Sequence, residues 1–488
     1  MPINDLREWI SAVHKRDDLR VVRGVNCELE MSALSEAIAR DRKSPRWAVL
    51  FDDIPGYPAG HRVLIDSCAT LSRTALTLGM NPDIDRRDFP HELKRRMKEM
   101  SLIPPRLVKS GPILENMLSG SKADLGAIPA PRWHTGDGGP YIGTGSVTIT
   151  RDADSGWVNL GTYRIMMHDP RTLSFMISPS RHGALHREKQ YARGEPIKVA
   201  VSLGHDPLLM LAGSTPIPAG MGEYDWCGGL RGEPIDVITG PDSGLPIPAT
   251  AEIVVEGISY PNEVRPEGPY GEFHGYYAGL QPNCPVIHVT NVMYRNAPIQ
   301  LAVPMICPSA GTLEFPSLIR EALVLDMLEK AGVPDIRGIH FHEAAAGLMF
   351  NIISLKQRYA GHSRQAARML TQSTGNLYMG RYTIVVDEDI NPYDMNEVIW
   401  AMGTRSDPQH AIEILTHCLT GPLDPAIKAD EQGRKVFNSR AIIDACKPWD
   451  WKDKFPPSVE TPPEMVAQAR QRFGDQLASV PVDPLRVG

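Results

Sequence analysis

Two carboxylates, Glu267 and Glu272, lie in the short segment Pro266-Glu-Gly-Pro-Tyr-Gly-Glu272 near the middle of the chain. The glycines and the proline between them favour a shaped turn over a helix or a continuous strand. Upstream, Asn159 contributes an amide and Arg164 a guanidinium. Carboxylates can take up and release protons, and a guanidinium can bind a carboxylate substrate. These side chains predict an enzyme that moves protons and handles a carboxylate substrate.

A second set of side chains, Asn159, His182 and Glu223, offers an amide oxygen, an imidazole and a carboxylate. Together these groups can close around a hard or borderline divalent ion. Taken singly, each has a simpler interpretation: Asn159 is a turn or capping residue, Glu223 a solvated turn carboxylate, and His182 one half of a zinc pair with His186. Pro179 lies just upstream, so His182 could precede the helix and lack the facing geometry of such a pair. The residues alone leave these alternatives open.

The length and composition of the chain limit its class. Its 488 residues exceed one ordinary core, so we expect two or three domains. A hydrophobic content of 42%, a charged content of 22% and a net charge of −7 without a basic stripe indicate a globular protein that does not bind nucleic acid. We find no signal-peptide pattern and no apolar run near the ~20 residues of a membrane span. The seven cysteines are odd in number and never spaced C-x-x-C, which predicts a reducing, cytoplasmic location.

The pattern of turns and apolar runs changes along the chain. Helical patterns mixed with short strand-like runs come first, and the prolines near residues 103–131 indicate a boundary. Between residues 140 and 310, short β-branched runs separated by Gly, Pro and Asp predict an antiparallel sheet that closes into a barrel or a sandwich. After Pro316, a strand alternates with helices, which predicts an α/β domain.

Four motifs together resemble those of the UbiD-type decarboxylases, which use prenylated FMN. They are Trp157-x-Asn159-x-x-x-x-Arg164, Pro179-Ser-Arg-His182, Pro216-Ile-Pro218 followed by Glu223, and the Pro266–Glu272 segment. The resemblance covers the chain from end to end in the order of motifs, in length and in the change of domain type. It implies a three-part α/β (α+β) protein with a central split β-barrel that binds the flavin. The implied parts are an N-terminal α/β domain at 1–110, the split-barrel domain at 111–315, a C-terminal α/β domain at 316–455 and a tail at 456–488.

The resemblance also implies roles for individual residues. Asn159, His182 and Glu223 resemble the ligands of a Mn²⁺ ion that also holds the cofactor phosphate. Arg164, Glu267 and Glu272 resemble the catalytic triad, with Glu272 as the acid whose proton replaces CO₂. Members of the ubiquinone pathway end this motif in Asp, so the Glu of this chain counts against that pathway. The remaining implied assignments are cofactor binding by Asn159, Thr162, Arg164, Arg181, His182, Glu223 and Lys356, a K⁺ ion held at Thr144, Trp157, Ala212, Gly213 and Glu223, and a substrate pocket at Thr162 and Phe273.

The implied activity is a reversible, non-oxidative decarboxylation of an aromatic, heteroaromatic or α,β-unsaturated carboxylic acid. A flavin prenyltransferase would supply the cofactor, and the chain would form a homodimer or a homohexamer built from dimers, mainly through its C-terminal domain. Two alternatives stay open. A metal-dependent hydrolase could use the Asn/His/Glu ion to activate water, but it has no use for two glutamates around an arginine. A non-catalytic subunit of a larger carboxylase would be expected to lose part of the triad or ligand set, and all six residues are present.

The residues His340, His342 and Glu343 form one further motif that could ligate a metal from a strand. Nothing near them in the sequence completes a ligand shell, so we expect a structural role. The sequence contains no P-loop, no Rossmann glycine motif and no G-x-S-x-G elbow, so it does not favour the enzyme classes that depend on them.

Overall fold

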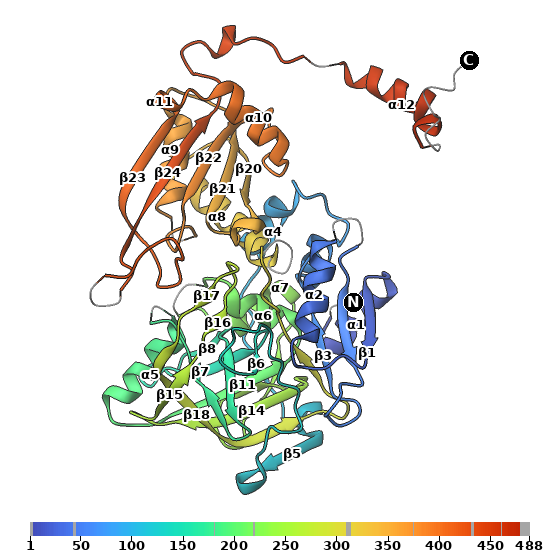
Figure 1. Ribbon diagram of the computed structural model, residues 1–488, viewed down its shortest axis with the longest axis vertical. Coiled ribbons are helices and arrows are strands. Elements are labelled where there is room, and N and C mark those ends of the chain that lie inside the picture. The colour runs from blue at the N-terminus through green and yellow to red at the C-terminus, as the bar shows by residue number, and fades with distance from the viewer. Residues whose placement is uncertain are drawn as a thin grey trace. The chain divides into compact units, whose positions relative to one another are not determined.

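The computed structural model describes residues 3–41, 45–179, 181–217, 220–308, 314–373, 375–430, 434–459 and 461–478. The chain divides into two compact units, Met1–Cys446 and Lys447–Gly488, which are described separately. The first unit contains a four-stranded, a ten-stranded and a five-stranded sheet together with two smaller ones, and helices connect them (Figure 1). The largest sheet curls into a half-barrel. This mixed α/β architecture confirms the predicted fold class, including its central split barrel.

The N-terminal part packs helices against a small mixed sheet. Its elements are α1 (Leu6–Lys15), β1 (Leu19–Arg23), α2 (Glu30–Arg40), β2 (Ala48–Asp52), β3 (Arg62–Ile65), α3 (Leu71–Thr77), α4 (Phe89–Glu99) and, from much later in the chain, β19 (Ile299–Leu301). The strand order is β1-β2-β3-β19, in which only the β2–β3 pair is antiparallel. Helix α1 begins after Asp5, whose carboxylate accepts a hydrogen bond from the backbone N of Glu8 at 2.8 Å and so caps the helix.

The central part is built mainly of short strands. Its elements are β4 (Arg106–Leu107), η1 (Pro112–Glu115), β5 (Asn116–Ser119), η2 (Gly120–Lys122), β6 (Tyr141–Gly143), β7 (Val147–Arg151), β8 (Val158–Gly161), β9 (Ile165–Asp169), β10 (Thr172–Ser174), α5 (His182–Ala192), β11 (Ile197–Gly204), α6 (Pro207–Ser214), α7 (Glu223–Arg231), β12 (Asp236–Thr239), β13 (Pro246–Pro248), β14 (Ile253–Ser259), β15 (Val264–Glu267), β16 (Tyr270–Gly271), β17 (Tyr277–Ala278) and β18 (Gln281–Tyr294).

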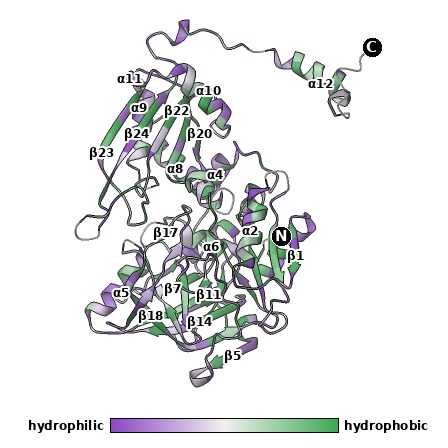
Figure 2. Cartoon of the chain, viewed as in Figure 1, coloured by the Kyte–Doolittle hydropathy of each residue, from purple (hydrophilic) through white to green (hydrophobic). Residues whose placement is uncertain are grey.

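The order of strands in the large sheet explains the half-barrel. The path runs β6-β9-β10-β18-β14-β11-β7-β8, and β5 and β15 also pair with β18. Strand β18 is 14 residues long and bends the sheet because it pairs with four different strands along its length. Apolar residues such as Val199, Val201, Val255 and Ile287 alternate inward and form a buried cluster. Figure 2 shows the same concentration of hydrophobic residues on the strands of this sheet.

The C-terminal part is a second α/β layer. Its elements are α8 (Glu314–Lys330), β20 (Ile336–Phe341), η3 (Glu343–Ala345), β21 (Phe350–Leu355), α9 (His362–Thr371), β22 (Tyr382–Asp387), α10 (Met395–Arg405), α11 (Pro408–Ala411), β23 (Ile412–Leu419) and β24 (Phe437–Ala445). The sheet order is β20-β21-β22-β24-β23. One buried cluster joins apolar residues of the sheet to α8 and α9, and a second joins the opposite face to α10. Helices α8 and α9 therefore cover one face of the sheet, and α10 covers the other. Part of the face under α10 is not covered by that helix and has exposed apolar residues.

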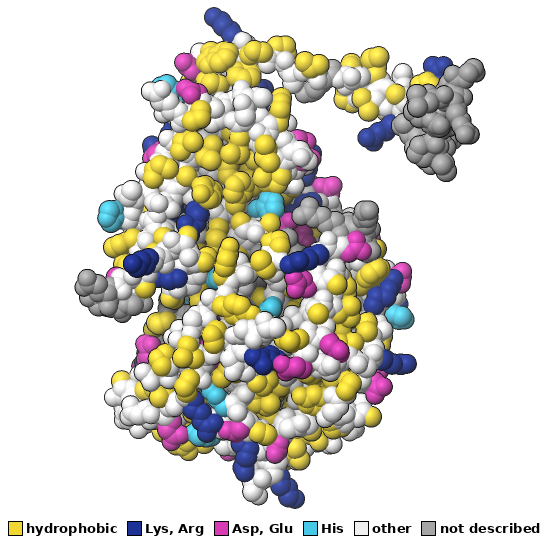
Figure 3. Space-filling model, in the orientation of Figure 1, with side chains coloured by type: hydrophobic (Ala, Val, Ile, Leu, Met, Phe, Trp, Pro, Cys, Tyr) yellow, Lys and Arg dark blue, Asp and Glu magenta, His cyan; other side chains and the backbone are white. Residues whose placement is uncertain are grey.

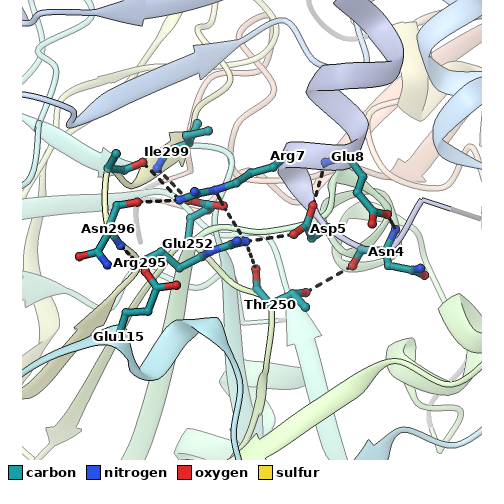
Figure 4. Close-up of polar contacts among 12 residues, drawn as sticks. Asn4, Asp5, Arg7, Glu8, Glu115, Thr250, Glu252, Arg295, Asn296 and Ile299 are labelled. Carbon is teal, nitrogen blue, oxygen red and sulfur yellow. Dashed lines mark hydrogen bonds and ion pairs between the residues drawn. The ribbon is translucent and has the colours of Figure 1, made fainter.

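A buried carboxylate ties the N-terminal helix to the central sheet (Figure 4). The side chain of Glu252 is fully buried just before β14. It accepts hydrogen bonds from Arg7 Nε at 2.8 Å and Nη2 at 2.9 Å, and from Arg295 Nη1 at 3.1 Å. Arg295 also bonds to the capping residue Asp5 at 3.0 Å. Because removing one partner of such a buried set leaves an uncompensated charge, this network fixes the start of the chain on the half-barrel.

The second unit, Lys447–Gly488, contains η4 (Lys452–Lys454) and α12 (Pro463–Ala478). Its described residues include exposed apolar side chains, among them Met465, Val466 and Phe473. The predicted boundaries at 110, 315 and 455 stay predictions. Among the helices described in either unit, none is both long and apolar enough to cross a membrane.

Candidate functional site

Arg164 lies between the two glutamates of the central turn. It follows β8 and precedes β9, whereas Glu267 ends β15 and Glu272 follows β16. Its guanidinium contacts Glu267 with two parallel bonds, Nε to Oε1 at 2.9 Å and Nη2 to Oε2 at 2.8 Å. A third nitrogen, Nη1, contacts Oε1 of Glu272. The structure therefore brings the predicted triad together, with all three side chains at most a tenth exposed.

The backbone of the turn explains how two nearby carboxylates reach one guanidinium. Gly268 has a φ of +89°, which a residue with a Cβ rarely adopts. The loop that contains Asp137 and Gly138 holds the turn from the other side. Gly138 N donates to Pro269 O at 2.8 Å, and Asp137 Oδ1 accepts from Gly271 N at 3.0 Å. A Cβ on Gly138 would collide with the carbonyl of Gly268, so this close approach requires glycine.

The two glutamates have different surroundings. Glu267 accepts both bonds of the arginine and a third from Tyr141 Oη at 2.8 Å. Burial raises the pKa of Glu272, the charge of Glu267 acts in the same direction, and Arg164 opposes them. Three hydrogen bonds thus hold Glu267 in place, whereas burial and the neighbouring carboxylate favour the protonated form of Glu272 by raising its pKa. Tyr141, on β6, was not predicted, and no spacing in the sequence connects it to Glu267.

The three predicted metal ligands come from neighbouring elements. Asn159 lies on β8, His182 is the first residue of α5, and Glu223 is the first residue of α7. Oε2 of Glu223 accepts a hydrogen bond from Leu160 N at 2.9 Å, which places this carboxylate beside the ligand strand. Burial raises the pKa of Glu223 to about 7. The amide nitrogen of Asn159 is buried without a partner of normal hydrogen-bond geometry among the described residues, although Tyr163 lies close to it. The carboxylate of Glu223 and the amide oxygen of Asn159 are groups that can ligate a cation, whereas the amide nitrogen is a donor that needs an acceptor.

The structure places His182 and His186 one turn apart on α5, so His182 does not precede the helix. Both imidazoles contact the ring of Trp157, at centroid distances of 4.9 Å and 5.2 Å. His186 is buried and its Nδ1 lies 3.0 Å from Oγ1 of Thr150. Burial and the charge of Arg181 lower the pKa of His182, which favours the neutral imidazole that a metal ion needs. Among the residues that the structure describes, no third His, Cys, Asp or Glu joins this pair in a metal-type cluster.

The other predicted site residues have mixed placements. The backbone N of Thr162 donates to Gly213 O at 3.1 Å, and its hydroxyl accepts from Ser214 Oγ at 3.1 Å. Phe273 is half-buried and packs against the central core next to Glu272. The predicted potassium ligands are already hydrogen-bonded: Ala212 O accepts from Thr215 N, Trp157 O from Asp152 N, Gly213 O from Thr162 N, and Thr144 Oγ1 from Val303 N.

Lys356 lies away from the other predicted residues. It follows β21 at the end of the strand where Leu355 pairs with Ile336, and its Nζ is 3.4 Å from a carboxylate oxygen of Glu388. The opposite end of β21, where Phe350 pairs with β22, is the end near Tyr378, and the charge of Glu272 influences the pKa of that tyrosine. The charged contact of Lys356 is therefore with Glu388 of the same sheet region and not with a residue of the triad.

Arg181 occupies the N-cap position of α5 and is exposed. A second arginine, Arg320 on α8, lies close enough that burial and the charge of Arg181 lower the pKa of Arg320 to about 10. Two like charges near the start of a helix form a place where an anion is favourable. Sequence reasoning missed Arg320, because α8 is distant in the chain and carries no motif.

Comparison with known proteins identifies the family. Residues 10–90, 106–307 and 315–445 match the N-terminal, the Rift-related and the C-terminal domain models of 3-octaprenyl-4-hydroxybenzoate carboxy-lyase, UbiD. The chain belongs to the UbiD family. This UbiD chain is therefore a carboxy-lyase, and the predicted recognition and enzyme class are confirmed.

Three relatives indicate the range of the family around this UbiD chain. It is 31% identical over 458 residues to a phenolic acid decarboxylase of Streptomyces sp. (strain D7), with 92% of this chain and 93% of that protein covered. It is 30% identical to a pyrrole-2-carboxylic acid decarboxylase of Pseudomonas aeruginosa, with 91% of each covered. An evolved dimeric form of the UbiD-class enzyme HmfF from Pelotomaculum thermopropionicum, in complex with prFMN, superposes with a TM-score of 0.80 at 26% identity, over 94% of this chain and 97% of HmfF.

Proposed function

We propose that this UbiD chain is a reversible, non-oxidative decarboxylase of an aromatic, heteroaromatic or α,β-unsaturated carboxylic acid, and that it uses prenylated FMN and Mn²⁺. The observation that carries the proposal is the buried arrangement of Arg164 between Glu267 and Glu272. Relatives of this chain act on phenolic acids and on pyrrole-2-carboxylic acid, and a structural relative binds prFMN. These names support an sp²-carbon acid as the substrate class.

The residues of the triad would perform separate steps. When bound, the prenylated flavin supplies the electron sink that makes loss of CO₂ from an sp² carbon feasible. Arg164, held in one plane by Glu267, binds and orients the substrate carboxylate. After the C–C bond breaks and CO₂ leaves, Glu272 gives its proton to the same carbon and then regains one from water. The reverse direction uses Glu272 as the base.

The cofactor and its ions would be held by residues of the central part. Asn159, His182 and Glu223 supply the Mn²⁺ donors, and the ion offsets the charge of the cofactor phosphate. Arg181, with Arg320 beside it, offers that phosphate a further positive charge. We keep K⁺ in the proposal, with backbone carbonyls near Gly213 as its ligands, and we do not retain Lys356. A flavin prenyltransferase would supply the cofactor, and the seven unpaired cysteines suit a reducing, cytoplasmic compartment.

The C-terminal sheet offers a surface for a second copy of the chain. Ile412 and Ile414 on β23 alternate on one face and are 41% and 60% exposed, and Tyr382 on β22 is 43% exposed. Figure 3 shows hydrophobic side chains gathered over this part of the molecule. Exposed apolar patches of this kind mark interaction sites. We therefore propose a homodimer, or a homohexamer built from dimers, joined through this face.

Two other functions are less well supported. A metal-dependent hydrolase would use the Asn159 site to activate water, but the paired glutamates on Arg164 would have no part in it. A non-catalytic subunit of a larger carboxylase would not need to keep Arg164 between two buried glutamates. No observation favours either function over the decarboxylase.

The cofactor provides the decisive experiment. The chain is produced in one host that contains a flavin prenyltransferase and in one that lacks it, and both preparations are tested with a panel of aromatic acids. Only the first should absorb in the near-UV and visible range, release CO₂ and exchange deuterium into the substrate in D₂O. Full activity in flavin-free protein would contradict the proposal and favour the hydrolase.

A further inference from the structure

A cluster of possible metal ligands lies where β20 ends, on a different part of the chain from the triad. It consists of His340, His342 and Glu343, and one ligand atom from each lies within 4.8 Å of the others. Oε2 of Glu343 is 3.7 Å from His340 Nε2 and 3.8 Å from His342 Nδ1. The sequence alone indicated a structural role for this motif. The structure adds partners from elsewhere in the chain that change this interpretation.

The hydrogen bonds around His340 prepare its Nε2 for a metal. Its Nδ1 is 3.1 Å from Oε1 of Glu321, a fully buried carboxylate on α8. Arg86 Nη2 also lies 3.3 Å from Nδ1, but its shorter contact, 2.7 Å, is to the same oxygen of Glu321. Because the carboxylate of Glu321 is closer to Nδ1 than the guanidinium is, we place the proton on Nδ1. The lone pair is then on Nε2, the nitrogen that lies near Glu343. A carboxylate behind a metal-binding histidine is the usual second partner of such ligands.

The second histidine is prepared in the opposite tautomer. Nδ1 of His342 accepts a hydrogen bond from Ala344 N at 3.1 Å, so this nitrogen carries the lone pair. A metal ion would take the place of that hydrogen bond. His340 Nε2 and His342 Nδ1 lie 3.7 Å and 3.8 Å from Oε2 of Glu343, so three potential ligand atoms lie close together once His342 releases Ala344 N.

Carboxylates and arginines surround the cluster. The charges of Glu321 and Glu343 act on Glu314, and the charges of Arg86 and Arg46 oppose them. Oε2 of Glu321 is buried without a hydrogen-bond partner among the described residues. A buried carboxylate therefore lies behind the ligand His340.

We propose that His340, His342 and Glu343 bind a divalent metal ion, with zinc as the preferred one, through His340 Nε2, His342 Nδ1 and a carboxylate oxygen of Glu343. Two imidazoles and one carboxylate are a common zinc ligand set, with water in the fourth position. Bonds of about 2.0–2.1 Å in a tetrahedral site place ligand atoms about 3.3 Å apart. The present spacings are 3.7 Å and 3.8 Å to Glu343, and the ligand atoms of the cluster all lie within 4.8 Å of one another, so the three side chains would close around the ion.

The place of the site in the fold suggests what the ion does. The ligands lie at the start of the turn between β20 and β21, and Gly347 in the same turn accepts a hydrogen bond from Arg320. Arg320 and Glu321 are neighbours on α8. Glu321 contacts the ligand His340, and Arg320 contacts the carbonyl of Gly347 in the turn. The ion would fasten this turn to α8, close to Arg181 of the central part.

The experiment measures zinc content in a background that lacks the other site. The full-length His182→Ala variant loses a ligand of the proposed Mn²⁺ site, so zinc that it retains after desalting reports the second site. It should retain one zinc per chain by elemental analysis. Adding Glu343→Gln or His342→Ala should remove that zinc. Adding His410→Ala should leave it in place, because His410 forms an exposed pair with Asp407 at 2.7 Å and belongs to no cluster of three among the described residues.

Crystals of the wild-type chain soaked in zinc provide a second measurement that needs no variant. An anomalous peak at the zinc edge should lie about 2.0–2.1 Å from His340 Nε2 and His342 Nδ1. Unchanged zinc content after Glu343→Gln, or no peak at this position, would overturn the proposal. Because the Asn159 site is disabled in the first experiment and resolved separately in the second, either result is independent of the proposed decarboxylase function.

Discussion

Arg164 and Glu267 form a two-pronged ion pair inside the protein, with bonds of 2.9 Å and 2.8 Å that fix the plane of the guanidinium. Glu272 contacts only the third nitrogen of the same guanidinium, Nη1. A substrate carboxylate that binds Arg164 must therefore displace Glu272 and not Glu267, because a bidentate pair is the stronger contact. This displacement would move the acid from the arginine towards the substrate carbon. In the proposed mechanism, the asymmetry of the triad would separate substrate binding from proton delivery.

The first prediction is that Glu272→Gln abolishes decarboxylation while Mn²⁺ and flavin stay bound. The amide keeps the shape of the side chain but cannot give up a proton, so turnover should fall by roughly 10²-fold or more. The measurement is CO₂ release together with metal and flavin content. Glu263→Gln is the control, because Glu263 is an exposed glutamate of the same part of the chain, paired with His288. Near-normal turnover by loaded Glu272→Gln protein would show that another group donates the proton.

The second prediction concerns pH. The pKa of Glu272 is raised by burial, so its carboxyl group is protonated below that raised pKa and loses its proton as the pH rises through it. Decarboxylation should therefore fall on the alkaline side of the kcat/KM profile. Deuterium uptake measured in the same buffers should follow the same limb. A flat profile up to high pH would mean that Glu272 is not the acid.

The third prediction is that Tyr141→Phe lowers kcat/KM for decarboxylation. The hydroxyl of Tyr141 donates to Oε1 of Glu267, the oxygen that also accepts from Nε of Arg164. A hydrogen bond to a charged group contributes about 1.5–3 kcal/mol, so losing this one from the pair that orients Arg164 should lower kcat/KM by roughly 10- to 100-fold. Tyr270→Phe is the control, because this ring packs on Tyr141 at 4.3 Å but does not bond to Glu267. Equal kcat/KM values for both variants would limit Tyr141 to packing.

The grouping of Arg164 with Glu267 and Glu272 could be predicted because the UbiD-type motifs that carry these residues are short and local. Glu267 and Glu272 lie in one turn whose glycines and proline determine its shape, and Arg164 lies in a second short motif. Tyr141 could not be predicted, because it reaches Glu267 only through the pairing of β6 with β9 in the folded sheet. The surroundings of Lys356 could not be predicted in this way. The sequence places it next to a strand, β21, but does not show how that strand lies relative to the triad.

The fold class was predictable for a similar reason. Short β-branched runs with frequent turns specify an antiparallel sheet, and their number suffices for a barrel. The sequence could not show that β19 leaves the central part to complete the N-terminal sheet. It also could not show that Glu321 on α8 lies behind His340, because that contact depends on how the helix packs on the sheet.

The fourth prediction is that His182→Ala and Glu223→Ala each lower Mn²⁺ content and flavin occupancy together, because the ion would connect the protein to the cofactor phosphate. Elemental analysis and the visible spectrum measure the two quantities on the same sample. His186→Gln is the matched control, since His186 lies one turn later on α5 and bonds to Thr150. Loss of metal with full retention of flavin would assign the phosphate to another group, with Arg181 as the first candidate. Metal loss in His186→Gln would favour the histidine pair.

The last prediction tests the C-terminal face as the contact between copies. Ile414→Asp introduces a charge that a dimer would have to bury without a partner, which is strongly unfavourable, so the variant should be monomeric in light scattering. Ile399→Asp is an exact match in starting exposure, because Ile414 and Ile399 are both 60% exposed, yet Ile399 lies on α10 and not on the sheet. The Ile399 variant should keep the mass of the wild type. If the Ile414 variant also keeps it, the chains meet through another surface. A monomer that retains full turnover would further show that the triad and its cofactor site are complete within one chain.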